Sequence, residues 1–89
     1  MYTLYIIRCS DNSLYTGIAK NLEKRLVVHK NGRGSVYVRA RLPFSLVYTE
    51  KHKDRSHATK REMEIKKMTR QKKETLIRLC WEKKKSAKS

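Results

Sequence analysis

The amino-terminal residues constrain the fold of this chain most strongly, because they predict a β-hairpin. Tyr2–Cys9 is rich in strand-forming residues, Ser10–Ser13 is turn material, and Leu14–Ile18 is again apolar and aromatic. The chain is therefore expected to begin with two neighbouring strands. Tyr5 and Tyr15 lie on either side of the turn, and we expect them close to opposite each other.

A helix is expected next, over Leu22–Lys30. Asn21 is suited to cap this helix, and Glu23 in the first turn favours its amino-terminal end. The helix has an apolar face formed by Leu22, Leu26 and Val27. The residues suited to end it are Asn31, Gly32 and Gly34.

The stretch Arg33–Leu42 is basic, contains Tyr37 and shows no clear period, so it is either a loop or a short irregular helix. Its Arg33, Arg39 and Arg41 form either a phosphate-contacting surface or a solvated basic loop. Pro43 then precedes a third strand over Phe44–Thr49, with alternating side chains.

Two further helices are expected in the carboxy-terminal half. Asp54 or Ser56 caps the first, which continues through Met68. The second runs from Lys72 to about Glu82 and buries five residues: Leu76, Ile77, Leu79, Cys80 and Trp81. Residues 83–89 have no apolar residue beyond alanine, so we expect a folded domain over residues 1–82 and a disordered basic tail after it.

The charge of the chain points to nucleic acid as its partner. There are 23 basic and 8 acidic residues among 89, giving a net charge of +15, which favours sequence-independent attraction to phosphate backbones. A ribosomal protein or a basic membrane-surface peptide shares such a charge. However, the sequence has neither a long apolar segment to span a bilayer nor a signal peptide, so we expect a cytoplasmic protein.

Cysteine and histidine give little sign of a structural metal site. Cys9 and Cys80 do not form a C-x-x-C pair and are expected to be reduced packing residues. His52 and His57 have a spacing compatible with zinc, but without a cysteine pair a zinc site is not expected.

Glu62 is the acidic residue that most needs an explanation. Helical spacing places it between Ala58 and Ile65, so a carboxylate interrupts an apolar stripe. Such a group binds a metal ion, holds a proton or pairs with a cation. With a polyphosphate as partner, metal binding by Glu62 predicts metal-assisted chemistry on nucleic acid. The structural alternative is a salt bridge to Arg61, Lys66 or an arginine on another element.

Two residue pairs are candidates for a reactive site. The hydroxyls of Tyr5 and Tyr15 converge if the strands pair as expected, but a tyrosine takes a proton from water at neutral pH only with a lowered pKa, an adjacent base or a metal-bound hydroxide. The alternative is that both rings pack against the sheet. Arg25 and His29 share a helix face, where they contact a phosphate or form a solvent-facing basic edge.

These elements, taken in order, resemble the GIY-YIG nuclease family. The matching elements are Thr3-Leu4-Tyr5, Tyr15-Thr16-Gly17, Arg25 with His29, and Glu62 within the Ala-x-x-x-Glu-x-x-Ile-Lys stretch that begins at Ala58. The resemblance covers about the first 80 residues. More narrowly, the chain resembles the small stand-alone bacterial members of the YhbQ and YazA type.

The resemblance implies an α/β fold, with a small three-stranded antiparallel sheet flanked by helices, and cleavage of DNA with one divalent ion. By that resemblance Glu62 binds Mg²⁺ or Mn²⁺, Tyr5 helps to activate water and Tyr15 assists it. Arg25 stabilises charge on the phosphorane, and His29 donates to a phosphate or carries a proton. A cation that keeps most of its waters suits a single carboxylate ligand.

The chain departs from the family pattern in lacking the asparagine that many members place after the metal-binding glutamate. Lys66, Lys72 or Lys73 is a candidate to replace it. Six residues are expected to contact the nucleic acid: Lys24, Arg33, Arg39, Arg41, Lys66 and Lys73. Two functions follow as hypotheses: an endonuclease acting on DNA, with RNA as a further substrate, in repair or recombination, and a non-catalytic nucleic-acid-binding module. Neither requires a protein partner.

Overall fold

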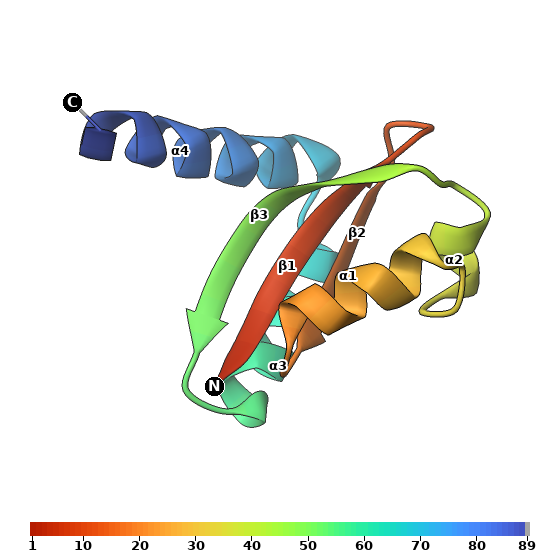
Figure 1. Cartoon of the computed structure of the whole chain (residues 1–89). Helices are drawn as coiled ribbons and strands as arrows, with labels where there is room; N and C mark the ends of the chain where they lie inside the picture. The colour runs from red at the N-terminus through yellow and green to blue at the C-terminus, as the bar shows by residue number, and fades with distance from the viewer. Residues whose placement is uncertain (89) are drawn as a thin grey trace.

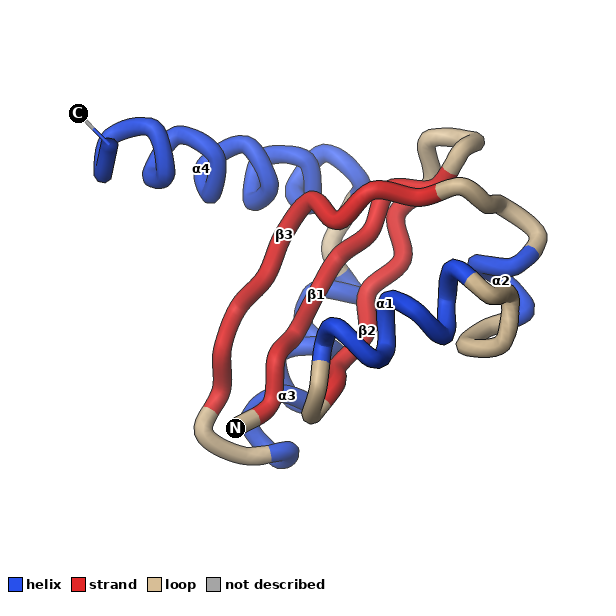
Figure 2. The backbone as a smooth tube through the Cα atoms, in the orientation of Figure 1, coloured by secondary structure: helices blue, strands red, loops and turns tan. Residues whose placement is uncertain are grey.

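A computed structural model describes the backbone of residues 1–88 and the side chains of residues 1–80. The amino-terminal hairpin is confirmed, with β1 at Tyr2–Cys9 and β2 at Leu14–Ala19. The third strand, β3 at Phe44–His52, is longer than predicted and pairs with the other edge of β1. The sheet is three-stranded and antiparallel in the order β2-β1-β3 (Figures 1 and 2).

Four helices flank this sheet, as the fold class predicts. Helix α1 spans Leu22–Lys30, α2 spans Val36–Arg39, α3 spans Arg55–Lys67 and α4 spans Arg70–Lys88. Of the two alternatives for the basic stretch, the structure has the short helix. Figure 1 shows α1 and α2 on one side of the sheet and α3 on the other, while α4 passes close to β3, far from the arrowhead of that strand, and extends beyond the sheet.

The helix ends follow local signals in the sequence. The side chain of Asn21 accepts a hydrogen bond from the Lys24 N–H at the start of α1. Asp54, rather than Ser56, caps α3 by accepting from the His57 N–H at 2.9 Å. A side-chain oxygen at these positions satisfies an N–H that has no partner inside the helix.

The alternation of β1 divides the core into two clusters. Leu4 and Ile6 are fully buried on the side of α3 and α4, where they pack with Ile65 and Ile77. Tyr5 and Ile7 are buried on the side of α1 and α2, where Val38 joins them. The central strand is therefore covered on both faces, and each face brings a different pair of helices to the sheet.

Helix α4 is tied to the hairpin by charge. Arg8 on β1 donates two hydrogen bonds to Glu74, at 2.5 and 2.9 Å, and Arg70 donates to the Asn12 carbonyl. The hydrogen bonds that Glu74 accepts, chiefly those from Arg8 and also one from Arg70, hold its pKa at about 2. The start of α4 is thereby fixed against the turn between β1 and β2.

Two apolar residues predicted to face the core do not. Leu79 is 50% exposed because it lies two residues beyond the buried Ile77 and so points to the other side of α4. Val27 is likewise exposed on α1, where the core contacts come from Leu22 and Leu26. Cys9 and Cys80 are free, as expected.

The carboxy-terminal tail differs from expectation over part of its length. The sequence predicts disorder over residues 83–89, whereas the described backbone is helical to Lys88, in keeping with the high helix propensity of lysine and alanine. Ser89 and the Trp81 side chain lie outside the described residues. The domain boundary after residue 82 stays a prediction. No helix in the described part of the chain has the length and apolar character to cross a membrane.

Candidate active site

His29 is the centre of the candidate site. It lies in the last turn of α1 and is 1% exposed, although the other residues of that turn face solvent. Its Nε2 is 2.8 Å from the Tyr5 hydroxyl on β1, and the hydrogen bond is buried. Its Nδ1 is also buried and has no hydrogen-bond partner among the described residues. A buried imidazole with an unpaired nitrogen is uncommon in a purely structural core.

Two glycines make room for this pair. Gly17 on β2 lies directly opposite Tyr5, and a Cβ at this position would be 2.6 Å from the Tyr5 hydroxyl oxygen. A Cβ on Gly34, in the loop before α2, would be 2.5 Å from His29 Nδ1. The sequence suggested only a helix-ending role for Gly34.

The protonation states of Tyr5 and His29 follow from their burial. Burial is the main reason that the pKa of Tyr5 lies well above its ordinary value, and Tyr15 raises that pKa further. Burial also lowers the pKa of His29, and the nearby positive charge of Arg25 lowers it again. Both groups are therefore neutral at neutral pH. Of the conditions under which Tyr5 could take a proton from water, the structure provides an adjacent base, His29, and not a lowered pKa.

Tyr15 lies beside this pair but not opposite Tyr5. The register places Tyr15 opposite Ile7, so the two tyrosines are diagonal neighbours on the same face of the hairpin. The two tyrosines are thus two residues away from the nearly opposite placement expected, because the strand pairing is centred on Asp11. The Tyr15 ring meets the His29 ring edge-on, with centroids 5.5 Å apart.

Arg25 and Glu62 approach the pair from different helices. Arg25 is exposed on α1, one turn before His29, and its charge lowers the pKa of Tyr5. Glu62 is on α3, and its negative charge raises the same pKa. The hydroxyl of Tyr5 thus lies within the field of one fixed positive and one negative side chain.

Glu62 fits the donor set of a hydrated divalent ion. Its side chain is 19% exposed and lies between the buried residues Ala58 and Ile65, as its spacing predicts. It pairs with Lys66 at 3.6 Å, which is one of the salt bridges foreseen for it. No group of three or more His, Cys, Asp or Glu side chains suited to a metal exists in the described part of the chain. A single carboxylate suits a divalent ion that keeps most of its waters.

The residues expected to contact nucleic acid are not equivalent in the structure. Lys24, Arg33 and Arg39 are exposed, and Lys73 is half-buried on α4. Lys66 is paired with Glu62. Arg41 donates to Asp11 at 3.0 Å and lies over the ring of Tyr37, 3.9 Å from its centroid. Their contacts with a nucleic acid stay predictions.

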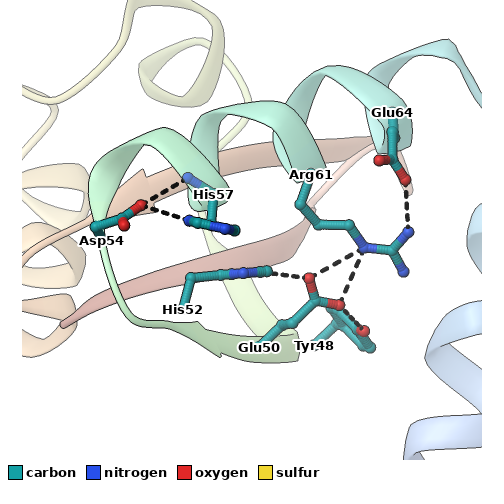
Figure 3. A network of polar contacts seen from close by, with 7 residues as sticks. All are labelled: Tyr48, Glu50, His52, Asp54, His57, Arg61 and Glu64. Carbon is teal, nitrogen blue, oxygen red and sulfur yellow. Dashed lines mark hydrogen bonds and ion pairs between the residues drawn. The ribbon is translucent and has the colours of Figure 1, made fainter.

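A polar network on β3 and α3 was not anticipated from the sequence. Glu50 accepts hydrogen bonds from Tyr48 and Arg61 and is 2.6 Å from His52, and Arg61 also reaches Glu64 (Figure 3). Hydrogen bonding to Glu50 and burial, with burial the larger effect, raise the pKa of Tyr48 to about 12. The signal was present, because three polar residues alternate along one strand face at positions 48, 50 and 52.

Comparison with known proteins identifies the family of the chain. The model of the GIY-YIG catalytic domain matches residues 1–75. A UPF0213 protein of Staphylococcus saprophyticus is 53% identical over 74 residues, covering 83% of this chain and 90% of that protein. A UPF0213 protein of Staphylococcus aureus is 51% identical over 75 residues, covering 84% and 92%.

Two solved structures share the fold. The UPF0213 protein of Bacillus halodurans, solved by NMR, is 39% identical with a TM-score of 0.59, over 89% of this chain and 85% of that one. A protein from E. faecalis is 38% identical with a TM-score of 0.62, over 88% and 83%. The family model, the relatives and the solved structures agree, and the chain belongs to the GIY-YIG catalytic domain family, beside the small bacterial UPF0213 proteins.

Proposed function

We propose that this protein is a metal-dependent endonuclease that hydrolyses DNA phosphodiester bonds. The observation that carries the proposal is the buried hydrogen bond between Tyr5 and His29, 2.8 Å long, for which Gly17 and Gly34 leave space. A core that needed only stability would gain nothing from an imidazole whose second nitrogen is unpaired. A site that moves protons needs such a group.

The Tyr5–His29 pair supplies a route for the proton of the attacking water. As the water oxygen attacks phosphorus, its proton passes to the Tyr5 oxygen, and the Tyr5 proton passes to His29 Nε2. No phenolate has to exist beforehand, so the raised pKa of Tyr5 is not an obstacle. The lowered pKa of His29 lets it release the acquired proton to solvent, and the leaving oxygen takes up a proton from solvent as its bond to phosphorus breaks.

Arg25 and Glu62 handle charge in this proposal. The exposed guanidinium of Arg25 donates to the phosphoryl oxygens as negative charge builds on them. Glu62 holds Mg²⁺ or Mn²⁺, which when bound withdraws charge from the phosphate. The ion pair with Lys66 is long, at 3.6 Å, so Glu62 can exchange that partner for a cation. Tyr15 assists Tyr5 from β2.

Binding rests on the surplus of positive charge, and DNA is the proposed partner, with RNA as a further one. A net charge of +15 attracts any polyphosphate, which leaves the preferred structure of the nucleic acid to the shape of the site. Branched or nicked DNA met in repair or recombination in the cytoplasm is the proposed setting. The alternative, a binding module without activity, accounts for the charge but not for the Tyr5–His29 pair.

A cleavage assay tests the proposal. Purified protein is incubated with duplex, nicked, flap and four-way-junction DNA, and with matched RNA, in Mg²⁺, Mn²⁺ or a chelator. Cleavage that requires the metal and is lost in His29→Ala supports the endonuclease. Tight, salt-sensitive binding without cleavage of any substrate in either metal would establish the binding module instead.

A further inference from the structure

Tyr37 links the candidate site to the outer surface of the molecule. Its ring is stacked on that of Tyr15, with centroids 5.9 Å apart and planes 28° from parallel. The guanidinium of Arg41 lies over the same ring, 3.9 Å from its centroid. Tyr37 therefore contacts Tyr15 and Arg41 at once, and Tyr15 in turn contacts His29.

Arg41 is held in place from several directions. Its Nε donates to Asp11 at 3.0 Å, and its Nη1 donates to the Tyr37 carbonyl at 3.1 Å. Its own carbonyl accepts from the Ser10 N–H at 2.9 Å. Asp11 is itself fixed by hydrogen bonds from the backbone and hydroxyl of Ser13. The guanidinium of Arg41 thus has a defined position against the hairpin turn, and it contacts the ring of Tyr37 from there.

The short helix that carries Tyr37 is anchored in the core by a different residue, Val38. Helix α2 has four residues and no side-chain cap, so it depends on tertiary contacts, and its Val38 supplies them as a fully buried core residue. Tyr37 is 38% exposed, and its neighbour Val36 is 73% exposed. The ring of Tyr37 is placed against Tyr15 rather than in the core.

We propose that Tyr37 and Arg41 are positioning residues that hold the Tyr15 ring against His29 in the reactive arrangement. The inference rests on the proposed endonuclease and adds two residues to its machinery. Tyr15 is half-buried on β2, which is an edge strand, and its ring meets His29 edge-on and is stacked on Tyr37. Displacement of a reacting group by about 1 Å is enough to slow turnover on the order of 100-fold.

This inference gives Arg41 a different function from a direct phosphate contact, and kinetics separate the two. A positioning arginine changes kcat and leaves DNA affinity almost unchanged. A phosphate contact changes Kd for every sequence and reduces the salt dependence of binding by about one counterion. Arg39, exposed two residues earlier, is the matched comparison, because its loss should weaken binding.

The test uses Tyr37→Ala, Tyr37→Leu, Tyr37→Phe and Arg41→Ala in the full chain. We expect Tyr37→Ala, Tyr37→Leu and Arg41→Ala to lower kcat by about 10-fold or more with Kd for DNA and Tm close to the wild type. Tyr37→Phe keeps the stacked ring and should keep kcat, and Val36→Ala is a matched exposed control on the same helix. If Tyr37→Ala proves unstable, Tyr37→Leu retains apolar bulk without the aromatic face.

A double-mutant cycle shows whether Tyr37 acts through Tyr15. In a Tyr15→Phe background the Tyr37→Ala change should have little further effect on kcat. An equal effect in both backgrounds, or an active wild type whose kcat does not change in Tyr37→Ala, would overturn the inference. NMR of ¹³C-labelled tyrosine provides a readout without activity. The Tyr15 ring signals should shift in Tyr37→Ala, and unchanged signals would overturn the stack even if the wild type cleaved nothing.

Discussion

The hydroxyl of Tyr5 and Nε2 of His29 share a buried hydrogen bond of 2.8 Å, although the two residues are 24 positions apart. Because both groups are buried and neutral, a proton taken up by one is most readily passed to the other. The charged residues of the site, Arg25 and Glu62, lie nearer to solvent on two different helices. Proton transfer and charge stabilisation are thus assigned to separate parts of the site.

Gly17→Ala should damage the site through a single methyl group. The added Cβ would lie 2.6 Å from the Tyr5 hydroxyl oxygen and 2.8 Å from its Cζ, and the buried ring cannot swing into solvent. We expect the free energy of unfolding to fall by about 1–3 kcal/mol and cleavage to fall beyond what the unfolded fraction explains. Denaturant unfolding and single-turnover kinetics measure both. Lys20→Ala, at an exposed position just after β2, is the control, and a Gly17→Ala protein equal to it would refute the close contact.

Tyr5→Phe should lower both turnover and stability. The ring and its packing remain, but His29 Nε2 loses its only hydrogen-bond partner in the described structure. We expect turnover to drop by about 100-fold or more and the unfolding free energy to fall by about 1–3 kcal/mol. Cleavage rates from quenched time courses and thermal unfolding test this prediction. Wild-type turnover in folded Tyr5→Phe would remove Tyr5 from the proton route.

The pH dependence of stability should report His29. Its pKa is lowered in the folded state, so the unfolded chain binds more protons once the pH falls below the ordinary histidine value of about 6.5. This contribution to stability is complete above that pH and is lost as the pH falls through the lower folded value. Glu74, with a folded pKa of about 2, loses its contribution only at more acid pH. Thermal unfolding between about pH 7 and 5 should show a steeper decline for the wild type than for His29→Gln. Parallel curves would contradict the assignment.

The network around Glu50 should hold α3, and with it Glu62, on the sheet. Glu50→Gln keeps the shape of the side chain but leaves the half-buried Arg61 without its main carboxylate partner. We expect a loss of about 1–3 kcal/mol in unfolding free energy, without a change in DNA affinity. Glu64→Gln is the matched control, since Glu64 is an exposed partner of the same arginine and should contribute between about 0 and 1 kcal/mol. Equal effects of the two variants would show that burial does not set the strength of the Arg61 contacts.

Local signals made much of the fold predictable. The hairpin, the Asn21 and Asp54 caps and the start of β3 follow from residues close together in sequence. The third strand was expected to end at Thr49, but it continues to His52 because backbone pairing with β1 extends an edge strand even where its side chains are polar. The exposed Leu79 shows a limit of the helical pattern. Apolar spacing identifies the buried face of a helix only when the apolar residues are confined to one side of it.

The residues of the candidate site could be proposed from the sequence, and their roles stay predictions, but the arrangement of their side chains could not be predicted. Helical spacing placed Arg25 and His29 on one face, yet it could not say that His29 is buried and Arg25 exposed. That difference depends on the strand residues beneath α1. The stack of Tyr37 on Tyr15 depends on how the loop after α1 brings α2 back to the hairpin, a relation between distant segments that no local pattern encodes.

Cleavage and binding by Glu62→Gln, measured side by side with the wild type in Mg²⁺, test the central claim most directly. The variant keeps the size of the side chain and removes the charge that would hold the ion. Lys66→Ala is the comparison, because it breaks the 3.6 Å ion pair but leaves the carboxylate, so it should still cleave once DNA is bound. We expect Glu62→Gln to bind DNA with a Kd close to that of the wild type and to cleave none of it. Wild-type cleavage by Glu62→Gln in Mg²⁺ would contradict the account.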